Sequence, residues 1–442
     1  MYAKWRQFVG DPLMPKEWPH RVRIGLNGFD SLARMLLRCS LDDKRGIDVV
    51  AINEPTLTPE QMLYLIKYDT SNGPFRGFVR NQVIVCPPKS DKRGEYCSIE
   101  IAGRLIGVFH EVEAEKIPWD WLDVEYVLET TGKLTRLSEA LKHVEGGRAR
   151  KVLVVGDAVD IPLLMYPISC RGYQRGTSIV ASGSSIAHAV ATIVSIIETS
   201  CAMEECIVTI LLPAGAQQNL VDGPTKNPRS WRLGRSAMQS IIPGRCPDVV
   251  QSVIQAIPSL QGRLDAIVMH VPTFSGAVVD LTCRSRVTVG SVSEVIDQIT
   301  RSTLLEKYNS LHSTTQPFIK SECDLKKPRP VSAASMPTSL DVSNSERSNS
   351  VSSAIGTGRA DISQAIQMPH DLTSIMVPLK KEDAFVSTDA TGKHTLSLLS
   401  MDCCICLPAG HIMKFVSWFD PCASYCERIL DTVVFMRGVD ET

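Results

Sequence analysis

A serine and a histidine stand four residues apart at Ser184 and His188, in the stretch S-I-V-A-S-G-S-S-I-A-H-A-V-A. On a helix this spacing puts both side chains on one face. One hypothesis is therefore a Ser–His dyad at a helix N-terminus, with hydrolase-like chemistry. A serine hydroxyl needs a positioned base, and no third group is identified here to orient the imidazole. The alternative is that His188 is a satisfied helix residue, one turn deeper than Ser184.

The second chemistry-bearing pattern is a candidate phosphate-binding turn. Over residues 21–52, an apolar strand leads into the turn N-G-F-D, a helix and a second strand. This is the order of a mononucleotide-binding βαβ unit. Such a turn follows G-x-G-x-x-G, and this chain has Gly28, Asp30 and Ala33 at the three glycine positions. Ala33 is a mild change, because a methyl group at the helix-packing position is often accepted.

Asp30 decides how well this turn could hold a dinucleotide. We expect its carboxylate where two phosphate charges should lie, and one like-charge pair at ~4 Å costs roughly 4 kcal/mol at an effective dielectric of about 20. At the adenosine end, Glu54 follows the second strand, where a carboxylate can accept hydrogen bonds from the ribose hydroxyls. The sequence therefore predicts weak adenine-nucleotide binding at best.

Fourteen cysteines raise the question of a disulfide or metal framework. Cys403, Cys404 and Cys406 form a cluster, and Cys422 and Cys426 are four apart. Cys403 and Cys406 are three apart, which is C-x-x-C spacing, but no histidine stands at zinc-finger spacing beside them. Because free cysteine is often buried, we interpret these residues as reduced thiols and expect no metal site. Metal binding is the minor alternative.

Composition is that of a soluble globular protein, since 44% of the 442 residues are hydrophobic and 21% are charged. Lys+Arg is 47 and Asp+Glu is 48, so no net charge attracts nucleic acid or an anionic membrane. The first twenty residues hold no apolar run long enough for a signal peptide. No stretch reaches the roughly 18 apolar residues of a membrane span.

The order of the expected elements predicts an α/β fold. Strands and helices alternate to about residue 155, which favours a doubly wound sheet. A long amphipathic helix at 184–199 is followed by elements that no longer alternate, which indicates a mixed α+β domain. Residues 312–375 break the pattern, because 328–363 is dominated by serine and cannot bury enough apolar surface to offset the entropy of ordering. We expect a disordered insertion, either a tolerated surface loop or a docking site for protein partners.

Eight sequence blocks occur in the order and spacing of one enzyme family. They are R-V-R-I-G-L-N-G-F at 21–29, V-V-A-I-N-E-P at 49–55, Y-D-T-S-N-G-P-F at 68–75, E-T-T-G-K at 129–133, V-D-G-P at 221–224, S-I-I-P at 240–243, V-V-D-L-T-C-R at 278–284 and V-S-W-F-D at 416–420. On these blocks the chain is identified as a member of the glyceraldehyde-3-phosphate dehydrogenase family.

The resemblance implies a division into parts. After an N-terminal extension at 1–20, a Rossmann NAD-binding domain would span 21–183. A catalytic-type domain would span 184–311 and 376–420, and a C-terminal helix at 421–442 would return to the first domain. Active relatives are cytoplasmic glycolytic homotetramers, which implies a cytoplasmic location and homo-oligomers or hetero-oligomers with other family subunits.

The catalytic positions depart from the family pattern. The nucleophilic cysteine matches Ser184, and no cysteine lies between Cys170 and Cys201. The general-base histidine matches Leu212, which can move no proton, whereas a positioned base contributes about 10²–10⁴-fold to a rate. The positions that would hold substrate phosphates also differ, and they are Gly215, Gln217, Cys246, Pro247 and His270.

The cofactor positions are partly kept. The family arginine of the phosphate turn is Ser31 here, and the asparagine that holds the nicotinamide amide matches Pro421. NAD binding is therefore expected to be weak or lost. The residues that would still contact NAD are Asn27, Gly28, Leu32, Glu54, Thr130 and Gly132.

Together these changes predict a pseudoenzyme, which keeps the family fold without phosphorylating dehydrogenase activity and acts as a scaffold, a regulator or a weak nucleotide binder. Three alternatives stay open. The chain could be an active NAD-dependent oxidoreductase on a different aldehyde, a hydrolase-like enzyme through Ser184 and His188, or a product with no selected role.

Overall fold

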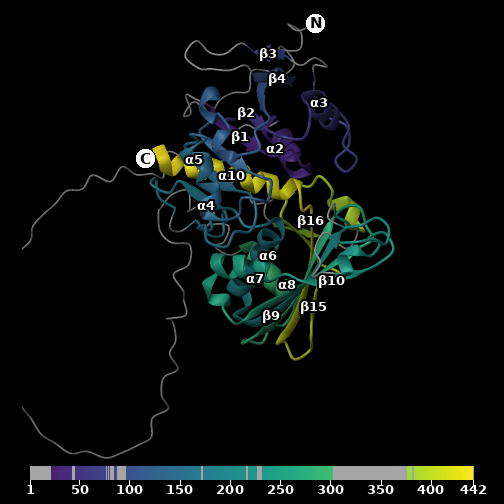
Figure 1. Ribbon diagram of the computed structural model, residues 1–442. Coiled ribbons are helices and arrows are strands. Elements are labelled where there is room, and N and C mark those ends of the chain that lie inside the picture. Colours follow the sequence, from purple (N-terminus) through teal and green to yellow (C-terminus); the bar gives the residue numbers. More distant parts are fainter. Residues whose placement is uncertain are drawn as a thin grey trace, which may run out of the picture.

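The chain folds around two eight-stranded sheets, which lie one above the other in Figure 1. The expected extension at 1–20 and the serine-rich insertion at 312–375 lie outside the described residues. The expected fold class, a Rossmann-type sheet followed by a mixed α+β domain, is confirmed. The computed structural model describes residues 21–41, 45–75, 77, 79, 84–86, 96–170, 173–215, 218–225, 231–301, 376–380 and 383–441.

The first sheet has the strand order β3-β4-β5-β2-β1-β6-β7-β8. The strands from β5 to β8 in this order run parallel, whereas β4 and β3 form an antiparallel edge. The strands are β1 (Val22–Asn27), β2 (Ile47–Asn53), β3 (Ile84–Cys86), β4 (Tyr96–Ile101), β5 (Arg104–Phe109), β6 (Tyr126–Glu129), β7 (Lys151–Val154) and β8 (Ile179–Ala181).

Both faces of the first sheet are buried. Leu128 and Leu153 enter one hydrophobic core, whereas their neighbours Val127 and Val152 enter another that contains Trp119. Successive strand residues point to opposite faces, so this division is what a parallel sheet covered on both sides requires. The covering elements are the α-helices α2 (Ser31–Leu41), α3 (Pro59–Lys67), α4 (Leu137–Ala140) and α5 (Lys142–Glu145) and the 3₁₀-helices η1 (Ala114–Lys116) and η2 (Trp119–Leu122).

The second sheet is mixed and has the order β10-β11-β9-β12-β16-β14-β13, with β15 paired to β16. Three helices pack on one of its faces around a shared apolar core, and they are α6 (Ser185–Cys201), α7 (Pro247–Ala256) and α8 (Val292–Arg301). The strands are β9 (Met203–Pro213), β10 (Ile242–Arg245), β11 (Leu264–Val271), β12 (Ala277–Ser285), β13 (Met376–Leu379), β14 (Ser397–Ser400), β15 (Ile405–Cys406) and β16 (Ile412–Phe419).

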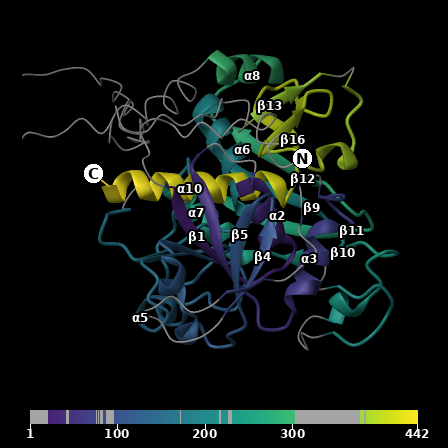
Figure 2. The same cartoon turned by 90° about the horizontal axis from the view of Figure 1, so that it is seen from above.

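The C-terminal helix α10 (Ala423–Glu441) packs against α2 in the core of the first sheet. Figure 2 shows this helix as a long yellow coil that crosses the molecule beside α2. It begins after Asp420, whose carboxylate accepts hydrogen bonds from the backbone N–H groups of Cys422 and Ala423. None of the described helices has both the length and the apolar character needed to cross a membrane.

Candidate functional site

The phosphate turn joins β1 to α2. Gly28 has φ +109°, and a Cβ there would stand 2.7 Å from the Thr130 Oγ1, so both the backbone conformation and the close approach require glycine. The carboxylate of Asp30 folds back on the helix, and its Oδ1 accepts a hydrogen bond from the Ala33 N–H at 2.9 Å. The position where a Rossmann helix binds pyrophosphate therefore carries the protein's own negative charge.

Asp30 is solvent-exposed, which changes the size of its expected effect. Water screens an exposed charge, so a like-charge pair at ~4 Å costs about 1 kcal/mol rather than roughly 4 kcal/mol. The sequence-based estimate of the penalty is thus too large, because exposure cannot be inferred from the residue type. The Asp30 carboxylate is still expected to weaken dinucleotide binding.

Glu54, which the sequence predicts to hold the ribose, directly follows the end of β2. Its Oε1 accepts hydrogen bonds from the backbone N–H and the hydroxyl of Thr56, at 2.8 and 2.5 Å. The residue is half-buried, so the carboxylate is held in place at the edge of the sheet. It could accept a ribose hydroxyl through its second oxygen.

Asn27 belongs to a buried polar network beneath the turn, which the sequence analysis does not identify. Its Nδ2 donates to Glu129 Oε2 at 2.5 Å, and its Oδ1 accepts from Asn53 Nδ2 at 2.8 Å. The Nδ1 of His143 accepts a hydrogen bond from Trp119 Nε1. The other ring nitrogen, Nε2, is therefore the donor of the hydrogen bond to Glu129 Oε2 at 2.9 Å. The Asn27 amide is therefore committed to holding β1, β2 and β6 together.

The other residues that the resemblance assigns to NAD lie around the same turn. Thr130 is buried, and its hydroxyl donates to the backbone oxygen of Asn27 at 2.8 Å. Gly132 has φ +65° with open space where a Cβ would stand. Leu32 is half-buried against the core of the first sheet. These residues shape the turn. Pro421, which the resemblance aligns with the asparagine that holds the nicotinamide amide, follows Asp420 at the start of α10 and has no side-chain amide.

Ser184 caps the N-terminus of α6. Its backbone is extended, with φ −78° and ψ 164°, and its Oγ accepts from the Ala187 N–H at 3.3 Å. Its own N–H donates to Asp157 Oδ1 at 2.9 Å, and the Ser252 hydroxyl donates to the same oxygen at 2.7 Å. The Ser184 hydroxyl, at the position that the resemblance assigns to the nucleophile, is thus used as a helix cap beside a carboxylate.

His188 is fully buried one turn deeper in α6. Its Nε2 donates to the Ser182 carbonyl at 2.8 Å, and its ring meets the edge of Tyr425 at 5.2 Å between centroids. Burial lowers the pKa of His188 to about 4, with a smaller contribution from nearby Arg428. The His188 N–H donates to the Ser184 carbonyl at 3.0 Å as part of the helix backbone. Among the described residues no hydrogen bond joins the His188 ring to the Ser184 hydroxyl, so the geometry favours the helix-residue interpretation over the dyad.

Acid should destabilise the protein through His188. Its folded pKa of about 4 lies below the unfolded value of about 6.5, so the unfolded chain binds more protons between these two pH values. Stability from this group is fully present above about pH 6.5 and falls by about 3 kcal/mol toward pH 4. Urea unfolding at a series of pH values should show this slope, and His188→Gln, which keeps a donor for Ser182, should remove it. An unchanged slope in that variant would contradict the assignment.

Leu212 lies near the end of β9, buried in the core of the second sheet. Its register partner on β11 is His270, so the two side chains stand on the same face of the sheet. Burial lowers the pKa of His270, and the Pro213 backbone carbonyl opposes this by accepting a hydrogen bond from the ring. A neutral imidazole therefore lies beside the position that the resemblance assigns to the base. The resemblance itself aligns His270 with a position that holds substrate phosphate, and the sequence alone gives only thin support for His270 as a replacement base.

The other substrate positions bring few anion-binding groups together. The Gly215 N–H donates to the Gln218 side chain at 3.1 Å. Cys246 precedes Pro247 at the start of α7, where proline provides no N–H. Gln217 lies outside the described residues.

The fold and this turn define a two-domain α/β protein whose first domain is of the dinucleotide-binding type. Residues 22–137 match the family described as glyceraldehyde 3-phosphate dehydrogenase, NAD binding domain. Residues 184–323 match the corresponding C-terminal domain. The chain belongs to the glyceraldehyde-3-phosphate dehydrogenase family.

Individual relatives agree with this assignment. The chain is 34% identical over 264 residues to glyceraldehyde-3-phosphate dehydrogenase of Schistosoma mansoni, covering 60% of this chain and 73% of that protein. Over 419 residues it is 26% identical to the protein of that name from Phaeosphaeria nodorum, covering 95% of this chain and 98% of that protein. A chloroplastic glyceraldehyde-3-phosphate dehydrogenase of Arabidopsis thaliana is 33% identical over 264 residues, covering 60% and 58%.

Proposed function

We propose that this protein is a family member without phosphorylating dehydrogenase activity, which keeps a weak nucleotide site and acts through its surfaces. One observation carries the proposal. The hydroxyl of Ser184, which the resemblance aligns with the nucleophile, caps α6, and Leu212, which it aligns with the base, is buried in the sheet core. A thioester cannot form on this site, because the reaction needs a thiolate and a proton acceptor.

The direct test is NAD reduction by the purified protein with glyceraldehyde 3-phosphate and phosphate. Wild type and Ser184→Ala should give the same background rate. Turnover that disappears in Ser184→Ala would overturn the proposal.

Asp30 should weaken NAD binding through its charge. Asp30→Asn keeps a helix cap of equal quality and removes only the charge. Because an exposed pair costs about 1 kcal/mol, we expect NAD to bind roughly fivefold to tenfold more tightly in this variant. Calorimetry with NAD and ATP measures it, with Asp30→Gly as the variant that also restores the family glycine. Equal affinity in wild type and Asp30→Asn would show that the carboxylate does not face the phosphates.

A second candidate is an active NAD-dependent aldehyde oxidoreductase. It is favoured by His270, which stands beside Leu212 with a depressed pKa, and so is a neutral proton acceptor near pH 7. NADH formation with a panel of aldehydes, lost in His270→Gln, would support it. The absence of a thiol at Ser184 makes it the weaker candidate.

Domain division, partners and location stay proposals. We place the domains at 21–183, at 184–311 with 376–420, and at 421–442. Assembly with itself or with other family subunits is supported by exposed apolar side chains near the second sheet, and the cytoplasm is the location implied by the resemblance. The exposed side chains are those of Ile207, Leu220, Val221, Trp231, Ile241 and Phe274.

A further inference from the structure

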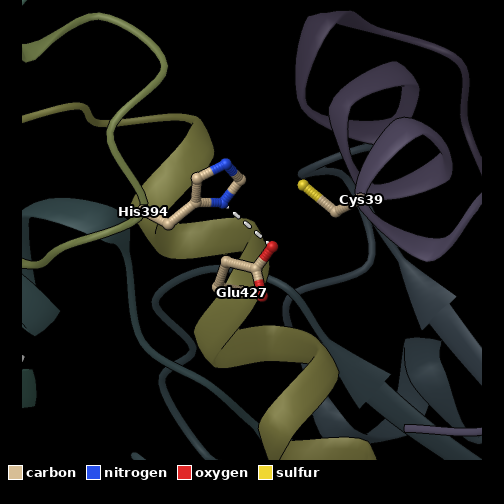
Figure 3. Close-up of side chains that lie close together, drawn as sticks. All are labelled: Cys39, His394 and Glu427. Carbon is tan, nitrogen blue, oxygen red and sulfur yellow. Dashed lines mark hydrogen bonds and ion pairs between the residues drawn. The ribbon is translucent and has the colours of Figure 1, made fainter. Parts of the chain in front are cut away.

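Three side chains from distant parts of the chain meet where α2 contacts α10. Cys39 lies on α2, Glu427 lies on α10, and His394 lies between the 3₁₀ turn at Ser387–Ala390 and β14. One potential ligand atom of each residue lies within 4.8 Å of the other two. Figure 3 shows the sulfur of Cys39 directed toward the His394 ring and the Glu427 carboxylate.

The donor atoms are of the kinds that zinc binds. Zn²⁺ takes sulfur, imidazole nitrogen and carboxylate oxygen at about 2.0–2.3 Å, so adjacent ligand atoms of a tetrahedral site stand roughly 3.3–3.8 Å apart. His394 Nδ1 and Glu427 Oε1 are already 3.0 Å apart. A thiol and an imidazole disfavour Ca²⁺ and Mg²⁺, which prefer oxygen ligands.

Surrounding groups hold the carboxylate and leave one oxygen toward the cluster. Glu427 Oε2 accepts from Arg45 Nη2 at 2.8 Å, while Oε1 faces His394. Arg45 also pairs with Asp431 at 2.6 Å, and Arg428 pairs with Asp431 at 2.8 Å. The two arginines are thus matched by two carboxylates, and an outer partner of this kind orients a metal ligand.

Further thiols lie close to the Cys39 sulfur. The Cys426 thiol is fully buried and donates a hydrogen bond to the Leu32 carbonyl at 3.7 Å. Burial, and then the neighbouring thiols of Cys39 and Cys422, raise its pKa. An ion pair between His394 and Glu427 alone would explain two of the three ligand groups. Apolar packing in the core of the first sheet accounts for the burial of Cys39, but not for the direction of its sulfur toward these two groups.

The geometry points to a zinc site formed by Cys39 Sγ, His394 Nδ1 and Glu427 Oε1. Binding releases the Cys39 thiol proton and needs the neutral imidazole, so the His394–Glu427 hydrogen bond gives way to two bonds to the metal. Water fills the fourth position, on the side where His394 is exposed. The metal joins α2, α10 and the segment before β14. This zinc site is proposed independently of the function proposed above.

The test uses the purified full chain after chelation, with Zn²⁺ in competition with a chelator and a reductant that contains no thiol. Wild type should bind one Zn²⁺ and show a higher melting temperature with it. Co²⁺ should give the thiolate charge-transfer absorption of a sulfur-ligated site. Cys39→Ser and His394→Ala should each weaken binding by at least about 100-fold, because each removes a direct ligand and loss of an outer-shell partner alone costs up to about 100-fold.

Two control variants test whether zinc binds at this cluster rather than at other cysteines or histidines. Cys403→Ser and His411→Ala remove exposed residues outside the cluster and should bind like wild type. Circular dichroism reports whether each variant is folded, and His394→Ala is the safer variant because its side chain is 58% exposed. The proposal fails if wild type binds no stoichiometric zinc, if folded Cys39→Ser and His394→Ala bind as tightly as wild type, or if Cys403→Ser abolishes binding.

Discussion

Ser184→Cys alone is expected to leave the protein without glyceraldehyde 3-phosphate oxidation. The new thiol would stand at the N-terminus of α6, which favours the thiolate. However, the residue's own N–H is bonded to the Asp157 carboxylate, and a neighbouring negative charge raises a thiol pKa. Leu212, at the position that the resemblance assigns to the base, supplies no imidazolium to offset that charge. The thiol should therefore stay mostly protonated at pH 7.

Adding Leu212→His should activate the thiol. A cysteine paired with an imidazolium has a pKa below about 7.5, whereas a free thiol has a pKa of about 8.5 and is a few per cent thiolate at pH 7. Alkylation of the introduced thiol in the double variant should be about 10-fold faster than in Ser184→Cys, with a detectable NADH burst on substrate addition. Peptide mass spectrometry after iodoacetamide labelling measures the rate at this one position.

Two controls make the result decisive. Ser184→Ala with Leu212→His gives the background from the other cysteines, and Ser184→Cys with Leu212→Gln tests whether any polar side chain suffices. If Ser184→Cys alone turned over substrate as well as the double variant, Leu212 would not be the missing base. In that case His270, its register partner, would be the next residue to replace.

Local patterns explain why much of the fold can be predicted from the sequence. The turn between β1 and α2 joins a buried strand to an amphipathic helix, and α6 is a long apolar run behind a capping serine. Strand β4 escapes such prediction because polar residues interrupt its pattern Y-C-S-I-E-I, although Ser98 and Glu100 are both buried in the fold. Pattern alone cannot reveal such burial.

The site is harder to predict than the fold, because it depends on contacts between distant segments. The resemblance assigns Asn27 to the cofactor, but its amide is bonded to Glu129 and Asn53, far along the chain. Cys39 and His394 are separated by most of the sequence, so no spacing rule brings them together. The sequence predicts the place of Asp30 at the helix N-terminus, but not its screening by water.

Charged residues on α10 are the clearest case in which the sequence misleads. Such residues normally mark a solvated helix face, yet Arg428, Asp431 and Asp440 are all buried here. Asp440 pairs with Lys151 at 2.6 Å, and Asp431 pairs with Arg45 at 2.6 Å. The helix is therefore attached to the first sheet by ion pairs as well as by apolar packing.

Asp431→Asn should cost about 3–5 kcal/mol of folding free energy, because it leaves the buried charges of Arg45 and Arg428 without the carboxylate they share. Urea and thermal unfolding measure the loss. The matched control is Arg245→Ala, which breaks an ion pair of similar length, 2.8 Å, to Asp265. Those side chains are 71% and 55% exposed, so this change should cost less than about 1 kcal/mol.

A double variant separates the ion pair from the packing around it. Arg45→Met with Asp431→Leu removes both charges of the pair, and it should be less destabilised than Asp431→Leu alone, because the single change leaves the buried charge of Arg45 only partly compensated. The coupling free energy between the two positions should exceed about 1 kcal/mol. Additive losses, or an Asp431→Asn variant as stable as wild type, would mean that water reaches these groups and that apolar contacts alone hold α10 against α2.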